Sequence, residues 1–260
     1  MDKETLDRLK SWFSDYCSGF RFSSTEDQRN IALKEIHTRN VCADMVRIAG
    51  EERVAGKSLL VAETVALFHD VGRFEQYRRY RTYRDSDSEN HALLGARILQ
   101  ETRVLEMLEE PERRIIIESV RLHNLFSIPR DVASDVKPFL ELIRDADKLD
   151  IWRVFIEQFR LPVAEQASAA FLGLPLTTTY TSDLLAYLHR GEMISLSRVK
   201  VVNDFKLLQM SWIFDLNCKA SLRMVEEREY ISHLAETLPD DEAIREVVEV
   251  LRKHLKERVA

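Results

Sequence analysis

Histidine and aspartate stand side by side in VALFHDVGRFEQY, residues 65–77, immediately after an apolar run. Both side chains titrate, and both are common metal ligands. A carboxylate without a partner is costly inside a protein, whereas a metal ion makes several such groups tolerable together. His69 and Asp70 therefore indicate a metal site at the end of a helix, and we expect Gly72 to stop that helix.

Three further histidines in the first 150 residues also lie on apolar faces of predicted helices. His37, His91 and His123 each have apolar neighbours three or four positions away, which is the spacing of one helical face. Asp147, in LIRDADKLDIW, lies on such a face too. One histidine of this kind is usually a satisfied core residue. Three of them together with Asp147 and the histidine–aspartate pair favour metal binding over a set of unrelated core positions.

The order of these residues resembles the HD-domain superfamily of metal-dependent phosphohydrolases. FHDVGRFEQ and DADKLD look like its two central motifs, and His37 stands where its first histidine is expected. His91 and His123 match the additional histidines of members that hold two metal ions rather than one. The resemblance covers residues 30–155 and does not extend to the chain after residue 160.

The resemblance implies a set of metal ligands. In HD proteins the aspartate of the histidine–aspartate pair commonly bridges both metals, so Asp70 would bridge here. One site would then be completed by His37, His69 and Asp147, and the other by His91 and His123. Imidazole and carboxylate ligands without thiolate suit one or two divalent transition metal ions, and the choice among Fe, Mn, Co, Ni and Zn stays open.

The segment DADKLD contains three aspartates. The resemblance favours Asp147, which precedes Lys148, as the ligand. Periodicity agrees, because Asp145 lies two residues away and therefore about 200° around the helix. Asp150, one turn further on, is a weaker candidate for an outer partner of the ligands.

Two metal ions can hold a hydroxide, polarise a phosphoryl oxygen and stabilise a leaving oxygen. The candidate catalytic residues are then Asp70, Arg73 and Lys148, and the candidate substrate-binding residues are Arg73, Gln76 and Lys148. Arg73 and Lys148 adjoin expected ligands and carry the positive charge that a phosphate needs. A surface ion pair explains Lys148 equally well. The other arginines and the tyrosines of the polar loop 73–84 fit a solvated loop with packed tyrosines better than a site for phosphates or bases.

Three functions from different classes fit this pattern. The first is a metal-dependent phosphohydrolase, of unresolved ester class, that acts on a nucleotide or another small phosphorylated metabolite. The second is a di-iron HD-type oxygenase, which would share the ligand set. The third is a sensor without catalytic activity, which the complete ligand set argues against. Within the superfamily the cyclic-dinucleotide and alarmone branches are disfavoured because their motifs are missing, and the triphosphohydrolase branch stays open.

The segments that carry these residues are predicted to be helices. The chain of 260 residues is 45% hydrophobic and has only 7 glycines and 6 prolines, a balance that favours helices over strands and turns. The sequence predicts an all-α fold, an HD-type helical bundle with additional C-terminal helices packed against it. The expected helices cover residues 2–19, 26–49, 58–71, 88–101, 111–125, 136–158, 182–190, 201–229 and 240–258.

The composition changes near residue 160, where prolines, threonines and small residues become frequent. We expect a catalytic core in residues 1–160 and a helical extension in residues 161–260 that packs on the core as part of one structural domain, because no flexible linker separates them.

The bulk properties limit the partners and the location of the chain. The formal net charge of −6 gives no basic field that would attract nucleic acid or an anionic membrane. No segment reaches the roughly 18 apolar residues of a membrane span, the N-terminus lacks a signal-peptide core, and three scattered cysteines suit a reducing compartment. We expect a cytoplasmic protein with a small phosphorylated substrate; the oligomeric state stays open.

Overall fold

The computed structural model describes residues 1–259, without the side chain of residue 163. Within these residues every regular element is a helix and no strand occurs, so the predicted all-α fold is confirmed. The chain forms two compact units. The first consists of Met1–Asp150 with Ala167–Leu172, and the second of Ile151–Gln166 with Gly173–Ala260. The packing of the C-terminal residues on the core, with a boundary near residue 160, stays a prediction.

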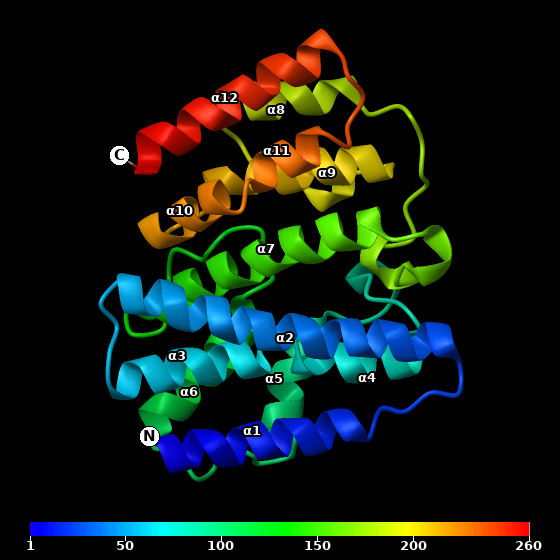
Figure 1. Ribbon diagram of the computed structural model, residues 1–260. Helices are drawn as coiled ribbons and strands as arrows, with labels where there is room; N and C mark the ends of the chain where they lie inside the picture. Colours follow the sequence, from blue (N-terminus) through cyan, green and yellow to red (C-terminus); the bar gives the residue numbers. More distant parts are fainter. Residues whose placement is uncertain (260) are drawn as a thin grey trace. The chain divides into compact units, whose positions relative to one another are not determined.

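The first unit contains most of the helices that the sequence predicts for the core. They are α1 (Lys3–Ser18), α2 (Thr25–Glu51), α3 (Lys57–Phe68), α4 (Val71–Tyr80), the short 3-10 turn η1 (Asp85–Asp87), α5 (His91–Glu101) and α6 (Glu110–Leu122), followed by α7 (Lys137–Arg160) up to Asp150 and by η3 (Ser168–Phe171). Figure 1 shows α3 and α4 following one another along the length of α2, with α1 on the other side of this pair.

Capping residues determine where the site-bearing helices start. The Asn90 side chain accepts hydrogen bonds from the backbone N–H groups of Ala92 and Leu93, at 3.0 and 3.1 Å, which makes His91 the first residue of α5. The predicted start at residue 88 was therefore wrong by three residues. Pro111 lies in the first turn of α6, where a missing backbone donor is tolerated.

Two glycines allow α4 and α5 to pack closely. A Cβ atom on Gly72 would lie 2.2 Å from the backbone oxygen of His91 and 2.7 Å from the backbone nitrogen of Gly95. Gly95 is less crowded, with Val120 Cγ1 and Val71 Cγ1 3.3 Å from the position of its Cβ. The sequence suggested that Gly72 stops a helix, and the structure shows that it does not. It lies in the first turn of α4 and lets the backbone that follows Asp70 approach the start of α5.

The polar loop expected after the histidine–aspartate pair is largely helical. The helix α3 ends at Phe68 rather than at residue 71, and α4 runs from Val71 to Tyr80. Phe74 and Tyr77 are buried on one side of α4, and the Phe74 ring packs edge-on against Phe13 of α1, with ring centroids 5.8 Å apart. Five arginines in twelve residues hid this helical period in the sequence.

The second unit contains shorter helices. They are the end of α7, η2 (Val163–Glu165), η4 (Ser182–Leu184), α8 (Leu185–His189), η5 (Leu196–Arg198), α9 (Val202–Ser211), η6 (Trp212–Phe214), α10 (Lys219–Glu227), α11 (Tyr230–Ala235) and α12 (Glu242–Val259). Trp152 is fully buried and packs against Trp212 and Tyr230, with ring centroids 5.8 and 5.7 Å away.

The single helix predicted for residues 201–229 is interrupted. The helix α9 ends at Ser211, and the chain turns through residues 215–218 before α10 begins at Lys219. The Asn217 side chain donates to the backbone oxygen of Asp215 at 3.2 Å. Asparagine and aspartate favour such local bonds over helix bonds, which accounts for the break.

Candidate metal centre

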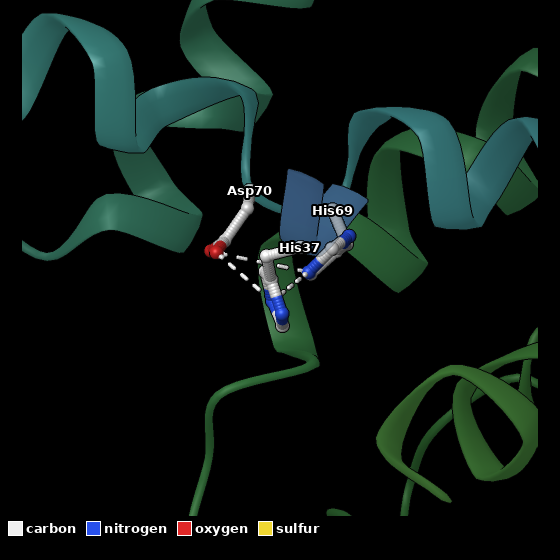
Figure 2. A group of neighbouring side chains, drawn as sticks. All are labelled: His37, His69 and Asp70. Carbon is white, nitrogen blue, oxygen red and sulfur yellow. Dashed lines mark hydrogen bonds and ion pairs between the residues drawn. The ribbon is translucent and has the colours of Figure 1, made fainter. Parts of the chain in front are cut away.

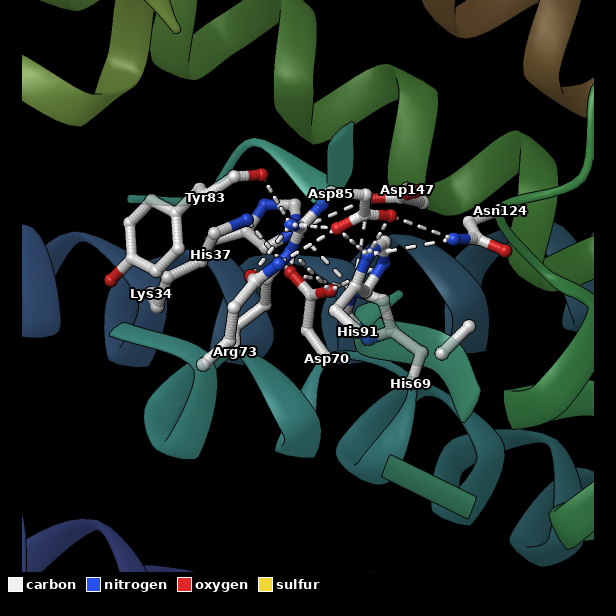
Figure 3. A network of polar contacts seen from close by, with 12 residues as sticks. Lys34, His37, His69, Asp70, Arg73, Tyr83, Asp85, His91, Asn124 and Asp147 are labelled. Atoms are coloured by element: carbon white, nitrogen blue, oxygen red, sulfur yellow. Dashed lines mark hydrogen bonds and ion pairs between the residues drawn. The ribbon is translucent and has the colours of Figure 1, made fainter. Parts of the chain in front are cut away.

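Four histidines and two aspartates from five different segments meet inside the first unit. His37 lies in the middle of α2, His69 directly follows α3, and Asp70 occupies the junction between α3 and α4. The other three are His91 at the start of α5, His123 directly after α6, and Asp147 in α7. All are buried except the Asp147 side chain, which is 19% exposed. The structure thus brings together all six residues that the sequence nominated as metal ligands. Figure 3 labels five of them, all except His123.

One donor group forms around Nε2 of His37, which lies 3.3 Å from Nε2 of His69 and 3.1 Å from Oδ1 of Asp147. Oδ2 of Asp70 lies 3.5 Å from the His37 nitrogen and 3.7 Å from the His69 nitrogen. Figure 2 shows His37, His69 and Asp70 pointing toward one another. We call His37, His69, Asp147 and this Asp70 oxygen the first donor group.

A second donor group forms on the other oxygen of Asp70. Oδ1 of Asp70 lies 3.4 Å from Nε2 of His91 and 3.9 Å from Nε2 of His123, and these two nitrogens are 3.1 Å apart. The ligand atoms of Asp70, His91 and His123 all lie within 4.8 Å of one another, as do those of His37, His69 and Asp70. The Asp70 carboxylate therefore faces both donor groups, one oxygen toward each.

The Nδ1 atom of each of the four histidines lies within hydrogen-bond distance of an oxygen atom. Nδ1 of His69 lies 2.7 Å from the Ala66 backbone oxygen, and Nδ1 of His123 lies 2.8 Å from the Val120 backbone oxygen. A carbonyl oxygen only accepts, so both Nδ1 atoms carry the proton. In the neutral imidazole this leaves a lone pair on Nε2, which points into the centre. Facing lone pairs repel unless a cation lies between them, so the donor set fits a metal ion.

Carboxylates hold the other two histidines in the same way. Nδ1 of His37 lies 2.6 Å from Oδ2 of Asp150, and Nδ1 of His91 lies 2.8 Å from Oδ2 of Asp85. Carboxylate–histidine pairs of this kind orient the ring and raise the basicity of a metal-binding nitrogen. Asp150, the weaker candidate for an outer partner of the ligands, thus contacts His37, whereas Asp85 had not been singled out from the sequence.

Burial keeps the two histidines of the second donor group neutral. Burial, followed by the neighbouring His91 and His69, lowers the pKa of His123 to about 3. Burial and then Arg73 also lower the pKa of His91, against the opposing effect of Asp85. Both imidazoles are therefore unprotonated at neutral pH, which is the form that binds metal.

Charge partners dominate the first donor group instead. Burial and Lys34 lower the pKa of His37, but hydrogen bonds to Asp147 and Asp150 outweigh them and raise it overall. Burial alone would raise the pKa of Asp70, yet Lys34 and the surrounding histidines and arginine hold it well below its usual range. Asp70 is thus an ionised carboxylate in the interior, a group that only strong partners or a metal ion stabilise.

Two cations contact Asp70. Nζ of Lys34 donates to Oδ2 of Asp70 at 2.7 Å, and Nε of Arg73 lies 3.4 Å from Oδ1. Lys34 was not nominated from the sequence. A signal was present, because Lys34 lies one turn before His37 and so reaches the same side of α2, but a lysine there is indistinguishable from a solvated one without the fold.

Asp85 joins several of the nominated residues. Besides His91, it accepts hydrogen bonds from Nη1 of Arg73 at 3.0 Å, Nε2 of Gln76 at 2.8 Å and Nδ2 of Asn124 at 3.1 Å. Four donors on one carboxylate fix its position and thereby the His91 ring. The short turn η1 and the residue after His123 therefore both support the second donor group.

The candidate substrate-binding residues lie close to the centre but differ in their contacts. Arg73 also donates to Gln76 Oε1 and to the Tyr83 backbone oxygen, at 2.9 and 2.6 Å. Gln76 is fully buried, and its amide donates to Asp85, Ser88 and the backbone of Glu89. These contacts favour positioning roles for both side chains.

Lys148 is largely buried. Its Nζ lies 3.4 Å from the Arg144 backbone oxygen, which is a long hydrogen bond. The neighbouring Arg144 is also buried and donates to the backbone oxygens of His123, Leu125 and Phe126. Arg144 thereby fixes the segment that follows His123, another role that the sequence did not indicate.

A comparison with known protein families agrees with this geometry. Residues 35–152 match the model of the HD domain. The chain contains an HD domain. The match begins two residues before His37 and ends five residues after Asp147, so the HD domain includes both donor groups. No curated protein and no solved structure matched the chain.

Proteins with an HD domain generally belong to a superfamily of metal-dependent, hydrolase-type proteins, and HD domains bind divalent metal ions. The two clusters of histidine and aspartate in the structure are consistent with such a site. None of the helices in the described residues has the length and apolar character needed to cross a membrane.

Proposed function

We propose that this protein is a metal-dependent phosphohydrolase that acts on a nucleotide or another small phosphorylated metabolite. The observation that carries the proposal is the Asp70 carboxylate, whose Oδ2 faces His37 and His69 while Oδ1 faces His91. In this proposal His37, His69 and Asp147 would hold one divalent ion, His91 and His123 would hold another, and Asp70 would contribute to both.

Ions bound in this way supply Lewis-acid chemistry, namely an activated water and compensation of the charge on a phosphoryl group. The chain itself supplies the alignment. The Nδ1 partners of the four histidines fix each ring so that Nε2 faces the centre, and Asp85 and Asp150 are the ionic members of that outer set. Because these partners are in place before substrate arrives, little reorganisation accompanies the reaction.

The positive side chains around Asp70 favour an anionic substrate. Lys34 and Arg73 both contact Asp70, and the Lys34 ammonium and the Arg73 guanidinium lie 5.4 and 5.8 Å from the centre of the Tyr83 ring. A phosphoryl group is the small anion that these two cationic side chains would bind best. Substrate binding by Arg73, Gln76 and Lys148 stays part of the proposal, with the contacts of Gln76 pointing more to positioning.

The test is a screen of metal-loaded protein against nucleotides and sugar phosphates, with released phosphate as the readout and oxygen uptake measured in parallel. We expect phosphate release that a chelator abolishes and that added divalent metal restores. Oxygen uptake by iron-loaded protein without phosphate release from any substrate would contradict the proposal and support a di-iron oxygenase.

A further inference from the structure

Lys34 projects from α2 against the residue that the two donor groups share. Its Nζ lies 2.7 Å from Oδ2 of Asp70, and its side chain is 14% exposed, so the ammonium is at the centre rather than in bulk solvent. The Tyr83 ring lies beside the ammonium, 5.4 Å from Nζ to the ring centre. Figure 3 shows Lys34, Tyr83 and Arg73 on the same side of Asp70, with Asn124 on the opposite side.

Lys34 and Arg73 differ in how many acceptor groups of the protein they contact. The Arg73 guanidinium donates to Gln76, to the Tyr83 backbone and to Asp85, and its Nε pairs with Asp70. In the described part of the chain, Oδ2 of Asp70 is the one oxygen that accepts from Lys34. Arg73 is therefore held by several acceptors, whereas Lys34 depends on one.

The acceptor on which Lys34 depends belongs to the first donor group. Of the two Asp70 oxygens, Oδ2 is the one that faces Nε2 of His37, at 3.5 Å. A divalent ion held by this group would draw on the same oxygen and would repel the ammonium. Lys34 would then be a partly buried cation without its acceptor, a state that a second anion relieves.

We propose that Lys34 is a substrate-binding residue that pairs with the phosphoryl group when the first donor group holds its ion. This inference rests on the proposed function and names the residue that recognises the anion. The ammonium exchanges Asp70 for a phosphoryl oxygen, so it contributes a charge-assisted hydrogen bond to substrate. Its position one turn before His37 places that bond beside the ion.

A purely structural role for Lys34 leads to different expectations. If Lys34 only neutralised Asp70 in the metal-free chain, its removal would take away a cation that competes with the ion. Metal affinity would then rise, and the affinity of the loaded protein for phosphate would not change. Phosphate binding therefore separates the two roles without any measurement of turnover.

The experiment is calorimetric titration of inorganic phosphate into the full-length, Mn²⁺-loaded protein, with metal content and thermal unfolding measured for each variant. Lys34→Gln removes the charge, and Lys34→Met removes it while keeping the apolar stem. Lys34→Arg keeps the charge. Lys10→Gln is the matched control, because Lys10 pairs with Glu63 on α3 and touches neither donor group.

We expect Lys34→Gln and Lys34→Met to keep their metal and to bind phosphate about tenfold to a hundredfold more weakly than the wild type, since one hydrogen bond to a charged group is lost. Lys34→Arg should retain most of the affinity, and Lys10→Gln should match the wild type. Unchanged phosphate affinity in either uncharged variant would overturn the role of Lys34 and leave the proposed function intact. A wild type that holds metal but binds no phosphate would overturn both.

Discussion

Asp70 carries the central charge of the site, since each of its oxygens faces a different donor group. Asp70→Asn keeps the shape of the side chain but removes the negative charge that two ions would share. We expect both ions to be lost and phosphate release to fall by orders of magnitude, while circular dichroism stays helical because α3 is held by the buried Val65 and Phe68. Asp204→Asn is the control, since Asp204 is buried in the second unit, where it bonds Thr181. A fully active Asp70→Asn variant with normal metal content would refute this role.

Asp85 and Asp150 allow the two donor groups to be weakened separately. Asp85 orients His91, and Asp150 orients His37, each through Nδ1. Loss of such an outer partner typically costs about 10–100-fold in metal affinity. Asp85→Asn should therefore lower the metal affinity of the second donor group, and Asp150→Asn should lower that of the first. Competitive metal titration measures both affinities. If both variants lost the same ion, the division into two groups would be wrong.

At the scale of single residues, the sequence indicated the donors better than their partners. His37, His91 and Asp147 stand out because a polar group on an apolar helical face breaks a regular pattern. Lys34 and Asp85 break no pattern, because polar residues on α2 and in a charged loop are ordinary. Their roles come from contacts such as Lys34–Asp70 and Asn124–Asp85, which join residues 36 and 39 positions apart.

The close packing of α4 against α5 brings Asp70 to His91. Gly72→Ala would place a Cβ 2.2 Å from the His91 backbone oxygen, and backbone cannot move aside cheaply. We expect a loss of about 1–3 kcal/mol of stability from such overpacking, together with weaker metal binding at the second donor group. Chemical denaturation and metal analysis measure the two effects.

Gly50→Ala is the matched control for that substitution. Gly50 lies in α2, and nothing lies within 4 Å of the position its Cβ would take. Alanine is favoured over glycine inside a helix by about 0.5–1 kcal/mol, so this variant should be as stable as the wild type or more so. A Gly72→Ala protein as stable as Gly50→Ala would show that α4 and α5 do not require the glycine.

Among the elements, the long helices were predictable and the junction after His69 was not. An amphipathic period over many residues defines α2 and α7 within one or two residues of their observed ends. The end of α3 and the start of α4 depend instead on the tertiary fit of Gly72 and on the packing of Phe74. A glycine followed by several arginines looks like a loop when only local patterns are available.

For the molecule as a whole, the buried histidines make the stability of the metal-free protein depend on pH. The pKa of His123 falls from an ordinary 6.5 to about 3, and that of His91 is also lowered. Between these values the unfolded chain binds protons that the folded chain does not, so the free energy of unfolding decreases as pH falls from about 6.5 toward 3. His37, whose pKa is raised, acts with the opposite sign and offsets part of this loss.

Denaturant unfolding of chelator-treated protein at pH 7 and at pH 4.5 measures this dependence. We expect lower stability at pH 4.5, and we expect His123→Gln to reduce the difference because one of the histidines with a lowered pKa is gone. The aspartates with lowered pKa values contribute mainly below their ordinary 3.8 and so add only a small part of the difference between pH 7 and pH 4.5. Equal pH dependence in wild type and variant would contradict the assignment to His123.

The central claim is that one HD domain holds two divalent ions with Asp70 between them. Anomalous diffraction from crystals of the Mn²⁺-loaded full-length protein tests it most directly. We predict two anomalous peaks, one coordinated by His37, His69 and Asp147 and the other by His91 and His123, with one Asp70 oxygen on each. Peaks that these side chains do not coordinate, or a metal-loaded protein in which Asp70 contacts no ion, would contradict it.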